Sequence, residues 1–136
     1  MIAQKEIQLP AFSRGMHLIT DIISNNLPDL PEYGILHIFI KHTSASLTIN
    51  ENADPSVRVD FQNFIDKFAP DNTPYFTHTD EGADDMPSHI KHSFIGSSLS
   101  IPITNGRLNL GIWQGIYLLE FRNYRKSRTI VLTVYS

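Results

Sequence analysis

The apolar positions along the chain fall into short runs at both ends and into a helical pattern in the middle. Runs rich in Ile, Leu and Val, bounded by Gly, Pro or polar residues, are typical of strands. They predict strands at 2–9, 15–19, 35–40, 47–49, 99–103, 107–110, 112–121 and 129–135. Thr104-Asn105-Gly106 predicts a turn between two of them, and Thr20-Asp21 predicts the start of a short helix.

The clearest helical pattern begins after Asp54. Its apolar residues recur every three or four positions and share one face, namely Val57, Phe61, Phe64, Ile65 and Phe68. Asp54 is expected to cap this helix, because its carboxylate can accept the free amide hydrogens of the first turn. A second helix is predicted from about Pro87 to a stop at Gly96, with Ile90 and Phe94 on its buried side.

Strands at both ends around two substantial helices predict an α+β fold with mainly antiparallel or mixed β-sheets. The length of 136 residues fits a single domain spanning 1–136, and 41% hydrophobic with 18% charged residues is ordinary for a soluble protein. No apolar run approaches the roughly 20 residues that span a bilayer, and the N-terminus lacks the pattern of a secretory signal. We therefore expect a cytoplasmic protein without a membrane partner.

The charge balance and the absence of cysteine limit which partners and which metal ligands the chain can have. With 11 basic and 14 acidic residues the net charge is -3, which does not favour a nucleic-acid partner. The basic residues are scattered except for one cluster, which we interpret as a solvated turn: Arg122, Arg125, Lys126 and Arg128. Because the chain has no cysteine, any metal site must use His, Asp or Glu.

A first polar cluster follows the predicted strand 35–40. His42 falls where the strand ends, a common position for functional side chains, whereas His37 lies inside the apolar run and is expected to be a core histidine. Further along, an acid is flanked by two amides, in the order Asn50, Glu51 and Asn52. These three residues either form a turn or place an acid near His42, and the sequence leaves both interpretations open.

A second polar cluster covers residues 78–92, of which seven are acidic or histidine. Imidazole and carboxylate groups together suit a divalent cation such as zinc. The start of the predicted helix, with Lys91 nearby, also favours a phosphate. On a helix His89 and His92 lie about 60° apart, so both can face one cleft. The spacing matches no known zinc motif, so metal ligation and ordinary hydrogen-bonded histidines both remain open.

Two other features bear on function. Trp113-Gln114 is either a core tryptophan followed by an amide at a sheet edge, or a pair that binds a flat ligand ring, with Trp113 stacking on it and Gln114 forming a hydrogen bond to it. A serine hydrolase is less well supported, because there is no Gly-x-Ser-x-Gly motif and Ser44 and Ser46 have only the neighbouring His42 as a base. Gly-rich phosphate loops are absent.

Together these motifs closely resemble the YjbQ-like family, often called secondary thiamine-phosphate synthase enzymes. The resemblance runs over nearly the whole chain and rests on motifs in the right order: His42 to Ala45, Ile49 to Asn52, Asp54-Pro55, His78, Glu81-Gly82, Asp84 to Pro87, His89 to Lys91, Gly106 to Leu108 and Gly111 to Gly115. One departure follows Glu120, where many relatives have a histidine and this chain has Phe121. A role for that histidine is not carried over.

The resemblance implies an α+β homotrimer with its polar motifs near subunit boundaries. It also implies a thiamine-phosphate synthase activity, which joins a thiazole phosphate to a pyrimidine pyrophosphate and is either the main role or a side activity. Loss of pyrophosphate leaves positive charge on the pyrimidine methylene, so such a site needs a cation for the leaving anion and a firm hold on both substrates.

From the resemblance we assign hypothetical roles to the motif residues. A divalent ion, zinc first and magnesium or manganese as alternatives, would be held by His42, His78 and His89. Glu51 and Asp85 would be catalytic, through metal support or proton transfer. A phosphorylated small molecule would be bound by Thr43, Ser44, Asn50, Asn52, Lys91, Trp113 and Gln114. The alternatives are a metal-dependent hydrolase that uses a bound water, and a non-catalytic trimeric protein that binds a small metabolite.

Overall fold

A computed structural model describes residues 1–136 and contains two antiparallel sheets and three helices. The strands are β1 (Ile2–Gln8), β2 (Gly15–Leu18), β3 (Tyr33–Ile40), β4 (Ala45–Glu51), β5 (Ser98–Thr104), β6 (Arg107–Leu108), β7 (Gln114–Glu120) and β8 (Thr129–Tyr135). The helices are α1 (Thr20–Ser24), α2 (Pro55–Phe68) and α3 (Asp85–Ile95). The predicted α+β class with two substantial helices is confirmed.

The main core lies between the two sheets. One sheet has the strand order β1-β8-β3-β5-β6 and the other has the order β2-β7-β4. On the first sheet, Leu36 and Ile38 of β3 pair in register with Val134 and Leu132 of β8, and all four side chains are buried. The second sheet adds buried residues of β4 and β7 to the same cluster, namely Ala45, Leu47, Ile116 and Leu118.

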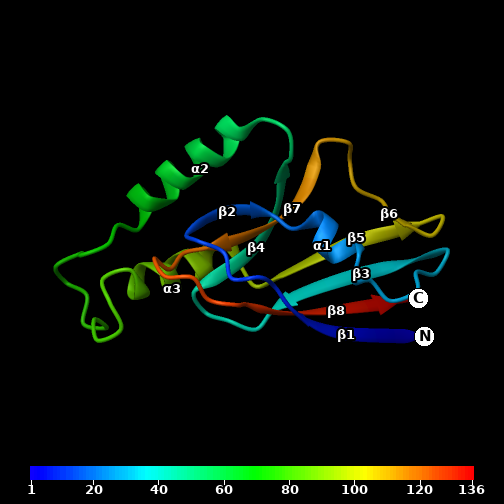
Figure 1. Cartoon of the computed structure of the whole chain (residues 1–136), viewed down its shortest axis with the longest axis horizontal. Helices are drawn as coiled ribbons and strands as arrows, with labels where there is room; N and C mark the ends of the chain where they lie inside the picture. The colour runs from blue at the N-terminus through cyan, green and yellow to red at the C-terminus, as the bar shows by residue number, and fades with distance from the viewer.

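α2 and α3 cover the other face of the three-stranded sheet, whereas Ile23 of α1 belongs to the main core. A second buried cluster combines Met16 of β2 with Tyr117 and Leu119 of β7, and Phe61 of α2 and Ile95 of α3 pack against it. Figure 1 shows α2 on the side of the molecule opposite β1 and β8, and the two chain ends side by side. The five-stranded sheet therefore keeps one face without a covering helix.

This open face corrects one prediction about β3. His37 is not a core histidine: it is partly exposed beside Ile35 and Phe39, whose exposed fractions are 48% and 41%. The strand alternates between core and surface because only one face of its sheet is covered.

The buried faces of α2 and α3 also differ from the predicted ones. Asp54 caps α2 as predicted, since its Oδ1 accepts the Ser56 amide hydrogen at 2.9 Å. However, Phe64 of the predicted apolar stripe is 69% exposed, so that stripe is only partly buried. The buried side of α3 carries Asp85 at the start of the helix, followed by Pro87, Ser88 and Lys91, and not Ile90 and Phe94 as predicted.

Phe94 is 73% exposed. It lies at the surface, where its ring contacts that of Phe68 edge to face, with ring centres 4.9 Å apart. The helix also starts at Asp85, two residues before the predicted position, and it ends at Gly96 as expected. The positive φ of Gly96, 105°, explains why a glycine ends it. None of the three helices is long and apolar enough to cross a membrane.

Candidate metal centre

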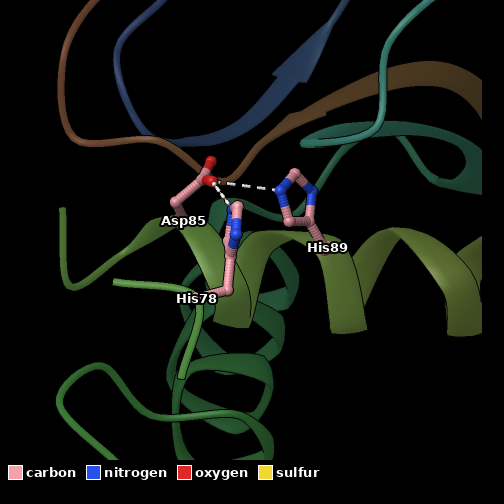
Figure 2. A group of neighbouring side chains, drawn as sticks. All are labelled: His78, Asp85 and His89. Atoms are coloured by element: carbon pink, nitrogen blue, oxygen red, sulfur yellow. Dashed lines mark hydrogen bonds and ion pairs between the residues drawn. The ribbon is translucent and has the colours of Figure 1, made fainter. Parts of the chain in front are cut away.

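Two histidines and one aspartate converge where the loop before α3 meets the first turn of that helix. Asp85 and His89 lie one turn apart on α3, and His78 comes from the preceding loop (Figure 2). Asp85 Oδ2 lies 2.7 Å from His78 Nε2 and 3.0 Å from His89 Nε2. One ligand atom of each residue lies within 4.8 Å of those of the other two. This donor set is the one that many catalytic zinc and iron sites use, with positions left open for substrate or water.

The ring of His89 is held in a single orientation by the chain segment before β4. Its Nδ1 lies 2.7 Å from the backbone carbonyl oxygen of Thr43, which can only accept a hydrogen bond. His89 Nδ1 must therefore carry a hydrogen, and in the neutral ring the lone pair is then on Nε2. That lone pair faces an oxygen of Asp85, so a proton or a metal ion is required between the two acceptors.

Arg122 fixes the carboxylates of both Asp84 and Asp85. Its Nε donates to Asp84 Oδ2 at 2.9 Å, its Nη1 donates to Asp85 Oδ1, and its Nη2 donates to the carbonyl oxygen of Glu81 at 2.7 Å. All three residues of this ion cluster are nearly inaccessible to solvent, with exposed fractions of 4%, 6% and 1% for Arg122, Asp84 and Asp85. Because Asp85 Oδ1 is bound to Arg122, only Oδ2 is left for the two histidines.

The electrostatics of this cluster favour a cation. Two carboxylates and one guanidinium leave a net charge of about -1 beside two histidines when these are neutral. Burial raises the pKa of Asp85, but the hydrogen bond from His78, the interaction with His89 and the charge of Arg122 outweigh it and hold that pKa below its usual value. Asp85 is therefore a carboxylate, the form that binds metal.

His42 is not part of this cluster, although it was expected to complete a three-histidine metal site. Its Nε2 accepts the backbone amide hydrogen of Thr129 at 2.9 Å, so this nitrogen has no lone pair left for an ion. Burial and the positive charge of Arg128 lower the pKa of His42, which keeps the ring neutral and suited to accept that bond. In this chain His42 joins the start of β8 to the segment before β4.

Lys91 also lies away from the position expected for a phosphate ligand. Its side chain has no exposed surface, and its ammonium donates to Asp66 Oδ1 at 3.0 Å. The same ammonium lies 5.7 Å from the centre of the Phe121 ring. Burial lowers the pKa of Lys91, an effect that the hydrogen bond to Asp66 opposes. Lys91 therefore joins α3 to α2 in the interior.

The other expected ligands divide between the two ends of β4. At the beginning, the carbonyl oxygens of Thr43 and Ser44 bind His89 and Arg128. At the far end, Asn50, Glu51, Asn52, Trp113 and Gln114 form or adjoin a turn. Glu51 Oε2 accepts two backbone amide hydrogens there, from Ala53 and Asp54, which is turn chemistry. Since β4 has seven residues, these two groups lie about 20 Å apart along the strand.

The sequence interpretation missed both buried arginines of the basic cluster. Arg122 holds the aspartates, and Arg128 is fully buried in a two-bond ion pair with Glu120, at 2.7 and 2.6 Å. Neither is the solvated turn residue that was expected. The one available signal was the pair Asp84-Asp85 at a helix start, because two buried carboxylates require a cation.

A hollow of about 200 Å³ opens beside His78. Its remaining lining is polar but uncharged or apolar and consists of Asn72, Thr73, Phe76, Thr79, Gly82 and Ala83. A ligand that enters it meets hydroxyl and amide groups, an aromatic ring and one histidine. The hollow therefore places room for a small molecule next to the two-histidine cluster.

Solved structures share this fold. A hypothetical protein from Aeropyrum pernix K1 aligns with a TM-score of 0.85 and 25% identity, covering 98% of both chains. An uncharacterized conserved protein of the yjbq/upf0047 family from Clostridium acetobutylicum aligns with a TM-score of 0.81 and 34% identity, covering 96% of this chain and 99% of that one.

Sequence comparison gives the family. The UPF0047 protein YjbQ of Escherichia coli O157:H7 is 53% identical over 133 residues, which is 96% of each chain. The profile of the UPF0047 protein YjbQ-like family matches residues 5–136. The chain belongs to the UPF0047 protein YjbQ-like family.

Proposed function

We propose that this protein is a metal-dependent enzyme that acts on a small phosphorylated metabolite, with a divalent ion held by His78, Asp85 and His89. The observation that carries the proposal is the pair of acceptors His89 Nε2 and Asp85 Oδ2, 3.0 Å apart, with the tautomer of His89 fixed by Thr43. In a tetrahedral zinc site, bonds of about 2.0–2.1 Å place ligand atoms about 3.3 Å apart. Small side-chain movements therefore suffice to admit an ion.

Each residue of the cluster has a defined task in this proposal. Arg122 keeps Asp85 ionised and points its Oδ2 at the histidines, while Thr43 keeps the lone pair of His89 on Nε2. The hollow beside His78 holds the uncharged part of the substrate. When bound, the ion supplies positive charge to a leaving phosphate or pyrophosphate, or activates a water.

The reaction we assign first is that of secondary thiamine-phosphate synthases, the transfer of a pyrimidine from its pyrophosphate to a thiazole phosphate. A net negative cluster with a divalent ion suits a reaction whose leaving group is an anion. The test uses protein stripped of metal and resupplied with zinc, manganese or magnesium, with both precursors added. Product should form only with metal and should be lost in His89→Ala; no product with any of the metals contradicts this assignment.

A metal-dependent hydrolase is the second candidate, and one observation favours it. The two cations that could bind a substrate phosphate, Lys91 and Arg122, already form ion pairs with carboxylates of the protein. A site without a free cation suits one attack by a bound water better than the binding of two phosphorylated substrates. Metal-dependent release of phosphate from p-nitrophenyl phosphate, without thiamine phosphate formation, would support the hydrolase.

We also propose that the chain assembles as a homotrimer. Supporting this, the apolar residues Val59, Phe64 and Phe68 of α2 and Phe94 of α3 leave 57%, 69%, 45% and 73% of their surfaces exposed. Exposed apolar patches of this kind mark protein contacts. Light scattering that reports a monomer at micromolar concentration contradicts the trimer.

A further inference from the structure

A second pocket lies at the far end of β4 from the metal centre. It has a volume of about 280 Å³ and lies between α1 and the turn that leads into β7, lined by Leu18, Thr20, Asp21, Ile22, Asn52 and Gln114. We call it the α1 pocket. The length of β4 separates it from His89 by about 20 Å. One small molecule in this chain cannot touch both places.

Two residues that line the α1 pocket, Leu18 and Asn52, can approach each other only over a glycine. β7 lies between β2 and β4, and Gly115 near its start lets side chains from the two sides approach over it. A Cβ at Gly115 would lie 2.6 Å from Leu18 Cδ2 and 2.9 Å from Asn52 Cβ. Both contacts are shorter than van der Waals contact allows, so the close approach of Leu18 and Asn52 requires glycine here.

The turn beside the pocket is rigid because its amides are used internally. Asn52 donates both side-chain hydrogens, to the carbonyl oxygens of Ile112 and Gln114, and its backbone amide donates to Trp113. Gln114 Oε1 accepts the backbone amide hydrogen of Gly111 at 2.7 Å. Trp113 in the same turn nevertheless remains 61% exposed. These hydrogen bonds hold the side-chain amides of Asn52 and Gln114, which line the pocket, in place.

These bonds decide which polar atoms remain for a ligand. Because Asn52 Nδ2 faces two carbonyls, its Oδ1 is left as an acceptor, and because Gln114 Oε1 is used, its Nε2 is left as a donor. The carboxylate of Asp21 makes no hydrogen bond or ion pair in the protein. No Lys or Arg lines the pocket. The free groups are thus two acceptors, one of them charged, the amide donor of Gln114, and the hydroxyl hydrogen of Thr20, whose oxygen accepts the Ile116 amide hydrogen.

We propose that the α1 pocket binds a small planar ring that carries an amino or amidine group. The N–H groups of such a ligand would bond to Asp21 and to Asn52 Oδ1, and Leu18 and Ile22 would contact the ring. A volume of about 280 Å³ fits one ring with its substituents. This site does not depend on the proposed metal chemistry, because none of its residues belongs to the metal centre.

The test is a titration of the wild-type protein with benzamidine, a flat amidinium, and with benzoate, its anionic counterpart, followed by amide NMR. Benzamidine should give saturable shifts centred on the side-chain amides of Asn52 and Gln114, and benzoate should bind at least 10-fold more weakly. Asp21→Asn should weaken benzamidine binding about 10-fold. The exposed Asp29→Asn, which makes the same change of charge, should leave it unchanged.

His89→Ala separates this proposal from the metal centre, since benzamidine binding should be the same in that variant. Equal binding of benzamidine and benzoate overturns the proposal, as does the absence of saturable shifts up to 10 mM, roughly the weakest affinity that one such ring would give. Shifts centred on His78 and His89 would also overturn it.

Discussion

His89 donates its Nδ1 hydrogen to the carbonyl oxygen of Thr43, 46 residues earlier in the chain, across 2.7 Å. The bond joins the first turns of α3 to the segment that enters β4. It also settles the chemistry of the ring, because the neutral form then has its lone pair on Nε2, beside Asp85. A backbone carbonyl thus prepares His89 as a metal ligand, a role that carbonyl groups often have around metal-bound histidines.

The first prediction concerns metal affinity. His89→Gln and Asp85→Asn should each lower the affinity for zinc by more than about 100-fold, because even changes around a metal ligand cost 10–100-fold. Isothermal titration with zinc measures this, and the shift of the thermal midpoint on adding zinc should vanish in parallel. His37→Gln is the matched control, since His37 lies on the open face of the five-stranded sheet. Wild-type affinity in both site variants would rule out this ligand set.

The second prediction concerns the stability of the Arg122 cluster. Arg122→Met should lower the free energy of unfolding by about 3–5 kcal/mol, because it leaves two buried carboxylates without their cation. Urea unfolding measures the loss. Arg107→Met, at an exposed position, should change stability by less than about 0.5 kcal/mol. A similar loss in both variants would mean that the buried ion pairs are not the cause.

The sequence predicted elements well where a local pattern decides them. α2 begins at Pro55, directly after the Asp54 cap, and the apolar runs near both ends of the chain form strands. Spacing and capping predict these elements because both act within a few residues. Which face of an element is covered depends on the rest of the fold. For this reason His37 and Phe94 were assigned to the interior, although both lie on faces that the chain leaves uncovered.

The candidate site was predictable in part for the same reason. His78, Asp85 and His89 come from one continuous segment, so their clustering was visible as a density of ligand-type residues. Arg122 reaches them from the segment just after β7, 37 residues after Asp85, and no spacing rule connects the two. His42 was added to the set from the resemblance, but its Nε2 accepts the amide hydrogen of Thr129.

The third prediction concerns pH. Burial and the charge of Arg128 lower the pKa of His42 in the folded protein, while the unfolded chain has the ordinary value of about 6.5. The unfolded state therefore takes up more protons as the pH falls through about 6.5, and the stability that His42 contributes is lost from there down to its folded pKa. It is fully present above about pH 7.5.

Urea unfolding at pH 7.5, 6.5 and 5.5 tests this prediction. His42→Gln, which keeps an acceptor for the Thr129 amide, should flatten the dependence of stability on pH over this range. His37→Gln should keep the slope of the wild type. If the two variants give the same slope, the loss of stability in acid comes from other groups.

The last prediction concerns assembly through the exposed side of α2 and α3. Phe68 and Phe94 contact each other edge to face, and Phe64, one turn before Phe68, is 69% exposed. Rings of this size gain stability when a partner removes them from water, by about 25 cal/mol for each Å² of apolar surface.

Light scattering of the wild type should give a mass near three times 15.4 kDa. Phe64→Glu should shift it to the monomer, because a carboxylate cannot be buried in such a contact without a cation. Tyr75→Glu, at a site 82% exposed in the loop after α2, should leave the mass unchanged. A trimeric Phe64→Glu protein would place the contact on another face of the molecule.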